Sequence, residues 1–196
     1  MVSAMDNRAN TASIYTSFLK KRKRTAEQPL DMKRLYVGHA NGTVSITQSD
    51  AVLACLAAPA DSLVYLDPPY NHRQYGNNYH VLNVLGDISE DKPVFGKGGI
   101  PTGWNRSLWC NTTGATAEFN KILAGTKAKY LVLSYSSDSI IPVPTILKSF
   151  ADNKWTVNQH TVAQKRFKSH NEGTQDVSEL FEYLFCARKE VCISNT

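Results

Sequence analysis

Short apolar runs alternate with helical patterns along most of this chain. Two β-branched and aromatic runs predict buried strands of a parallel sheet, over 62–66 and 129–134. Helices are predicted between and around these strands, over 51–58, 79–88, 115–123 and 144–151. Two later runs alternate apolar and polar residues and predict a terminal hairpin, with strands 155–167 and 180–188. Strands that alternate with helices indicate an α/β fold.

The first fifty residues carry a weaker pattern. A helix is predicted over 11–27, ended by Pro29, and short strands over 34–37 and 43–47. The helix contains five consecutive cations at 20–24, which suit either phosphate contact or a solvated helix C-terminus. The pattern therefore predicts two parts. A basic N-terminal helix and tail cover 1–30, and one folded domain covers 31–196.

Composition is that of an ordinary soluble globular protein. The chain has 196 residues, of which 42% are hydrophobic and 20% are charged, enough for one domain with a core of its own. A net charge of +5 suits a polyanionic partner. The sequence shows no signal-peptide pattern and no apolar stretch that approaches a membrane span.

The four cysteines do not form a metal-binding pattern. Cys55, Cys110, Cys186 and Cys192 make no CxxC pair and no ligand spacing with the five histidines. We expect reduced, mostly buried thiols in a cytoplasmic protein. The sequence thus predicts no metal site.

The strand at 62–66 leads directly into the residues that carry chemistry, Asp67-Pro68-Pro69-Tyr70 (the 67–70 loop). Strand pairing must stop there, because the two prolines have no backbone N–H and fix φ. In open α/β sheets, ligands bind at this end of the strands. The loop therefore presents a carboxylate, an aromatic ring and free carbonyl groups where a ligand is expected.

This loop suits reaction at the exocyclic amine of a nucleobase. The amine is a poor nucleophile because its lone pair is delocalised into the ring. A carboxylate such as Asp67 and a carbonyl such as that of Pro68 can accept its two N–H groups and localise the lone pair. Tyr70 offers a flat face for an extruded base, and Pro69 keeps the loop stiff. The alternative is a plain strand-ending turn.

The 67–70 loop resembles motif IV of the adenine-N6 DNA methyltransferases, and its Asp points to the Dam-like α group, the D12 class. Residues 71–80 continue the motif, and 133–137 resemble a later motif of the family. The resemblance runs from about residue 14 to 186. It implies a class I S-adenosyl-L-methionine (AdoMet)-dependent, Rossmann-like sheet that ends in an antiparallel hairpin. It also implies methyl transfer from AdoMet to N6 of a flipped adenine in double-stranded DNA, in a restriction-modification or phage-type enzyme.

The resemblance also suggests site residues. Asp67, Pro68, Pro69 and Tyr70 are the expected catalytic residues. Asp67 and Asp50 are candidate AdoMet ligands, and Asp50 is equally suited to cap the helix at 51–58. Candidate DNA contacts are Asn71, Arg73, Gln74, Tyr75, Tyr79, Ser134, Tyr135, Lys165, Arg166 and Lys168. The glycine-rich loop at 89–114 is also expected to cover the site or touch DNA, through Lys97 and Arg106.

Two features of the family are not found before Asp67. The aromatic-x-Gly-x-Gly turn that holds AdoMet has no counterpart there, and about sixty residues are too few for the recognition insert as well. We therefore expect a sheet that is incomplete on its N-terminal side. The chain is then the catalytic half of a split enzyme with a separate polypeptide partner, a truncated remnant, or a DNA-binding module without chemistry. Methylation of cytosine N4 or of RNA also stays open. A cytoplasmic, nucleoid-associated location follows from the DNA substrate.

Overall fold

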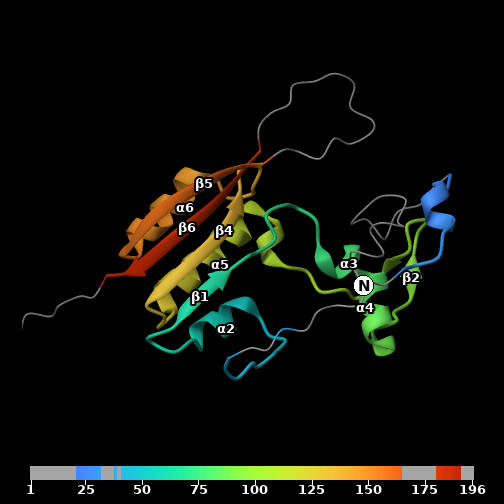
Figure 1. Cartoon of the computed structure of the whole chain (residues 1–196), viewed down its shortest axis with the longest axis horizontal. Helices are drawn as coiled ribbons and strands as arrows, with labels where there is room; N and C mark the ends of the chain where they lie inside the picture. The colour runs from blue at the N-terminus through green and yellow to red at the C-terminus, as the bar shows by residue number, and fades with distance from the viewer. Residues whose placement is uncertain (1–20, 32–37, 39–40, 165–179, 191–196) are drawn as a thin grey trace, which may run out of the picture. The chain divides into compact units, whose positions relative to one another are not determined.

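The computed structural model describes residues 21–31, 38, 41–164 and 180–190, which belong to two compact units (Figure 1). One unit takes in 1–46 and 73–107, and the other takes in 47–72 and 108–196. The second unit contains a four-stranded mixed sheet and its helices. The fold is therefore α/β, as the alternating pattern predicts.

The sheet consists of β1 (Leu63–Leu66), β4 (Tyr130–Ser136), β6 (Leu180–Lys189) and β5 (Trp155–Gln164), in that spatial order. β1 runs parallel to β4, whereas β6 is antiparallel to both of its neighbours. The terminal hairpin is thus confirmed, with its second strand inserted between β4 and β5. Because β1, β4 and β5 share one direction, all three end at the same side of the sheet, which we call the carboxyl edge.

Three helices cover one face of the sheet: α2 (Ala51–Leu56), α5 (Thr112–Gly125) and α6 (Val143–Asp152). α5 begins at Asn111, whose side chain accepts a hydrogen bond from the Gly114 amide at 2.7 Å, and Pro144 stands in the first turn of α6. Phe119 and Phe150 meet edge to face at 5.2 Å in the core. Burying such a ring stabilises the fold by about 1.5–3 kcal/mol.

The opposite face of the sheet, which we call the open face, is uncovered within the described part of the second unit. Side chains alternate along β1, so that Leu66 is buried while Leu63 and Tyr65 are each 57% exposed. A hollow of about 480 Å³ lies over this face, between Leu63, Tyr130 and other residues of all four strands. β1, predicted to be a buried strand, is therefore buried on one face of the sheet only.

The first unit contains short elements. They are η1 (Arg24–Glu27), α3 (Tyr75–Asn78), α4 (His80–Gly86), η2 (Ile88–Glu90), β2 (Val94–Phe95) and β3 (Ile100–Pro101). β2 and β3 form an antiparallel hairpin inside the segment predicted to be a loop, and Gly96 and Gly99 adopt φ of 67° and 63° in its turn. The predicted loop at 89–114 also contains η3 (Leu108–Cys110) and the start of α5, both in the second unit.

Two predictions for the first fifty residues need correction. Residues 43–47 are irregular and exposed, and Ile46 is 93% exposed. A β-branched run becomes a strand only where another strand pairs with it. Of the helix predicted over 11–27, the described residues show the single 3-10 turn of η1; 11–20 and the predicted strand at 34–37 lie outside the described residues. No helix in the described part of the chain is long and apolar enough to cross a membrane.

Candidate active site

The 67–70 loop leaves the carboxyl edge where β1 ends. Asp67 is exposed and the Tyr70 ring is 40% exposed, whereas Pro68 and Pro69 are half-buried. The Tyr70 carbonyl oxygen accepts a hydrogen bond from the Ile140 amide at 3.1 Å. The loop is therefore held at both ends, by β1 and by the turn after β4, while its carboxylate and its ring face solvent.

The turn after β4 is built from serine hydroxyl groups. The Ser139 hydroxyl donates to the Ser136 carbonyl and accepts from the Ser136 amide at 2.9 Å. The Ser137 amide in turn donates to the Phe181 carbonyl at 2.8 Å, and the Ser137 hydroxyl accepts from the Phe181 amide at 3.1 Å. These bonds tie the ends of β4 and β6 together beside the 67–70 loop.

Ser134 lies at the level of Asp67 in the sheet, because Leu66 pairs with Leu133 in the parallel register. It is half-buried and shares the open face with Asp67. Tyr135 does not belong to this surface. Its ring is 2% exposed in the helix-covered core, its hydroxyl lies 3.4 Å from the Ile141 amide that donates to it, and burial raises the pKa of Tyr135. The prediction that Tyr135 contacts DNA disagrees with this burial.

Glu182 is a site residue that the sequence analysis missed. It lies opposite Ser136 on β6, on the open face, on the other side of β4 from Asp67. Burial, and after it the Asp67 carboxylate, raises the pKa of Glu182 above its usual value of about 4.5. A charged residue inside the apolar run 180–185 was the available signal.

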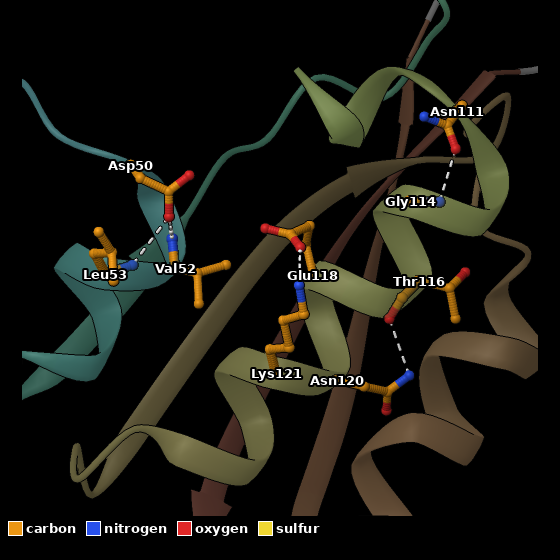
Figure 2. A network of polar contacts seen from close by, with 9 residues as sticks. All are labelled: Asp50, Val52, Leu53, Asn111, Gly114, Thr116, Glu118, Asn120 and Lys121. Carbon is orange, nitrogen blue, oxygen red and sulfur yellow. Dashed lines mark hydrogen bonds and ion pairs between the residues drawn. The ribbon is translucent and has the colours of Figure 1, made fainter. Parts of the chain in front are cut away.

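Asp50 caps α2. Figure 2 shows its carboxylate turned back onto the first turn of the helix, where one oxygen accepts from the Val52 and Leu53 amides at 3.0 and 3.1 Å. α2 is itself held by the Thr126 hydroxyl, which donates to the Cys55 carbonyl at 2.8 Å. The predicted cap is confirmed, and a carboxylate keeps acceptor positions for a second partner.

The residues that follow the 67–70 loop divide between the two units. Within the second unit, Asn71 is half-buried and the exposed His72 has its ring Nδ1 3.0 Å from the Cys110 carbonyl oxygen. This contact ties the chain after Tyr70 to η3. Burial raises the pKa of the Cys110 thiol, and likewise that of Cys55, for which the Asp50 carboxylate adds to the effect.

The remaining predicted DNA contacts with described positions lie in the first unit. Arg73 is exposed, and Tyr75 and Tyr79 pack edge to face at 5.2 Å, so each ring supports the other. Gln74 is engaged inside the unit: its Nε2 donates to the Ser107 carbonyl at 3.0 Å, and its Oε1 accepts from the Ser107 amide at 2.7 Å. This pairing gives Gln74 a structural role, and its contact with DNA stays a prediction.

Of the two cations expected in the long loop, Lys97 is exposed at the tip of the β2–β3 hairpin, and the Arg106 guanidinium lies 4.8 Å from the centre of the Trp104 ring. Lys165, Arg166 and Lys168 lie outside the described residues. Within the described ranges, no group of three or more His, Cys, Asp or Glu side chains is placed to hold a metal ion.

Comparison with known proteins identifies the family. The family model for D12 class N6 adenine-specific DNA methyltransferases matches residues 1–146. Type II methyltransferase M.NlaIII of Neisseria lactamica is 30% identical over 192 residues, covering 96% of this chain and 56% of the relative. M.CviAII of Paramecium bursaria Chlorella virus 1 is 31% identical over 188 residues, covering 94% of this chain and 54% of the relative.

A third relative, Type II methyltransferase M.FokI of Planomicrobium okeanokoites, is 26% identical over 200 residues, covering all of this chain and 30% of the relative. The chain thus spans about half or less of the length of these curated relatives. No solved structure matches it significantly. The family match includes the 67–70 loop and covers most of the chain, which therefore belongs to the D12 class N6 adenine-specific DNA methyltransferase family.

Proposed function

We propose that this chain supplies the catalytic loop for methyl transfer from AdoMet to N6 of an adenine in double-stranded DNA. The observation that carries the proposal is the presentation of Asp67 and Tyr70 at the carboxyl edge, on a loop anchored through the Tyr70 carbonyl. Family membership supports the same reaction.

The chemistry follows from the groups on the loop. The Asp67 carboxylate and the Pro68 carbonyl accept the two N–H groups of N6, which localises the amine lone pair and directs it outward. Tyr70 stacks on the extruded base, a contact of about 1–3 kcal/mol. Pro69 limits the motion of the loop between these two groups. The amine attacks the methyl group directly, so no covalent bond to the protein is required.

The described residues fit the cationic part of AdoMet. AdoMet supplies a methyl group on a positively charged sulfonium, and the carboxyl edge gathers the carboxylates of Asp67 and Glu182, which favour a neighbouring cation. Asp50 is the further candidate ligand, through the acceptor positions that its capping role leaves open.

The test is transfer of a radioactive methyl group from AdoMet to DNA prepared without methylation, followed by digestion and base analysis. We expect N6-methyladenine from wild type and none from Asp67→Ala. Asp61→Ala is the matched control, because Asp61 is an exposed aspartate before β1 and should retain activity. Full activity of Asp67→Ala would contradict the assignment. Label in N4-methylcytosine, or in RNA alone, would redirect it to another amine.

We also propose that the fold is a class I AdoMet-dependent sheet completed by a polypeptide segment beyond the described residues. The support is the open face, with Leu63 and Tyr65 exposed, together with the outer side of β1, which pairs with no strand within the described part of the chain. Parallel strands are normally covered on both faces. A separate polypeptide carrying the AdoMet-binding turn is the partner that we expect. Slower amide exchange across β1 when that partner is added would support this arrangement, and unchanged exchange in a mixture that methylates DNA would contradict it.

A further inference from the structure

Glu182 reaches the carboxyl edge because its strand runs against the others. β6 enters the sheet at this edge, so its first residues lie beside the last residues of β4, and Glu182 pairs with Ser136. Asp67 lies on the other side of β4, one residue beyond the Leu66–Leu133 pair. Both side chains project from the open face. The two carboxylates therefore flank the end of β4, with Ser134 and Ser136 between them.

The position of Glu182 is fixed on both sides along β6. The preceding residue, Phe181, exchanges two hydrogen bonds with Ser137, at 2.8 and 3.1 Å. The following residues continue the ladder with β4 and bury Phe185 completely in the core. The backbone at Glu182 is therefore held in place without a bound ligand, which suits a group that acts on a neighbouring carboxylate.

Few titratable groups lie near Glu182 within the described ranges. Asp67 faces it across β4, and His160 lies diagonally on β5, two pairs away from the Val162–Glu182 pair. Asp138 follows Ser137 in the turn that bonds to Phe181. Of these groups, Asp67 is the one that raises the pKa of Glu182, in addition to the larger effect of burial. Glu182 therefore has an increased affinity for a proton beside the proposed catalytic carboxylate.

We propose that Glu182 receives, by way of Asp67, the proton that N6 loses during methyl transfer. When the N6 lone pair forms the new N–C bond, the C–S bond breaks and its electron pair stays on sulfur. The positive charge then lies on N6, and breaking one N–H bond leaves N6-methyladenine and a proton on Asp67. Passing that proton to Glu182, and from its partly exposed side chain to water, returns Asp67 to the charged form. Glu182 thus acts through Asp67 and does not itself contact the substrate. This inference rests on the proposed function.

The experiment measures single-turnover methyl transfer to unmethylated DNA between pH 5.5 and 9, on the full chain together with any partner needed for activity. We expect Glu182→Gln to slow transfer about tenfold to a hundredfold at neutral pH. The acid limb of the wild-type pH profile should also disappear, since glutamine does not titrate. Glu182→Asp should restore part of the rate and an acid limb. DNA affinity should change less than threefold, and the rates are compared at saturating AdoMet.

Two controls separate this role from a structural one. Glu190→Gln makes the same change beyond the end of β6, where Glu190 accepts a hydrogen bond from Thr156 at 3.0 Å. His160→Gln removes the imidazole on the neighbouring strand β5. Both should keep the wild-type rate and profile. A wild-type profile for Glu182→Gln, or an equal loss at every pH, would overturn the inference. Inactive wild type would instead overturn the proposed function, and this inference with it.

Discussion

Replacing Gln74 by alanine distinguishes a structural residue from a DNA contact. In the first unit its side chain holds Ser107 by two hydrogen bonds, with the Gln74 nitrogen donating at 3.0 Å and the Ser107 amide donating at 2.7 Å. Each partly buried bond contributes about 0.5–1.5 kcal/mol. Loss of both should therefore destabilise the contact between the start of α3 and 104–107 by about 1–3 kcal/mol.

Amide hydrogen exchange at Ser107 measures this change directly. A loss of about 1–3 kcal/mol corresponds to roughly five- to 150-fold faster exchange wherever local opening controls it. Gln74→Glu is a graded variant, because the carboxylate still accepts from the Ser107 amide but no longer donates to its carbonyl. It should show a smaller acceleration. Gln159→Ala is the matched control, since Gln159 is exposed and its bond to Thr161 is long, at 3.5 Å.

DNA affinity, measured by fluorescence anisotropy at two salt concentrations, completes the test. If Gln74 serves the local structure, Ser107 exchange accelerates in Gln74→Ala, and any loss of DNA affinity is accompanied by that acceleration. If affinity falls while Ser107 exchange keeps its wild-type rate, Gln74 contacts DNA directly. That result would refute the reasoning from the hydrogen bonds and restore the prediction made from the sequence.

Three further substitutions test other parts of the chain. Gly76→Ala should destabilise the first unit by about 1–3 kcal/mol in urea unfolding, because the new Cβ would lie 2.5 Å from the Asn105 carbonyl oxygen; Gly86→Ala, with open space around it, should not. Asp50→Ala should cost α2 about 0.5–2 kcal/mol, whereas Asp50→Ser keeps a cap. A loss of AdoMet affinity in both Asp50 variants would indicate a ligand, and a loss in Asp50→Ala alone would indicate a cap. Glu182→Gln should raise Tm slightly at pH 7–8 but not below pH about 4. The neutral form of Glu182 is favoured in the folded state, so wild type loses stability as pH rises through the raised pKa; equal Tm values at pH 7–8 would contradict this.

Local chemistry made the end of β1 and the start of α2 predictable. The strand before Asp67 ends where two prolines remove the backbone donors, and this holds whatever surrounds the strand. The helix after Asp50 begins where the side chain caps it, as its residue type predicts. The antiparallel hairpin at the end of the sheet also follows from alternation and from the resemblance to the family. The strand end and the helix cap depend on residues that lie close together in the sequence.

The features that sequence reasoning missed depend on long-range partners. Gln74 has the side chain of a DNA contact, but a residue 33 positions away engages it. The ring of Tyr135 is buried because successive residues of β4 face opposite sides of the sheet, and the next layer covers only one of them. Residues 43–47 have the composition of a strand without becoming one. In each case the residue type fits two roles, and the tertiary partner decides between them.

The antiparallel insertion of β6 explains how one edge of the sheet gathers groups from distant parts of the chain. A parallel strand contributes its last residues to the carboxyl edge, as β1 does with the residues that lead into Asp67, but an antiparallel strand contributes its first ones. β5 ends and β6 begins at this same edge, at Gln164 and Leu180. The basic residues predicted to bind DNA, Lys165, Arg166 and Lys168, therefore follow in sequence from the edge that presents Asp67 and Tyr70. This connectivity is a physical reason to expect these basic residues and the proposed catalytic loop to serve one substrate.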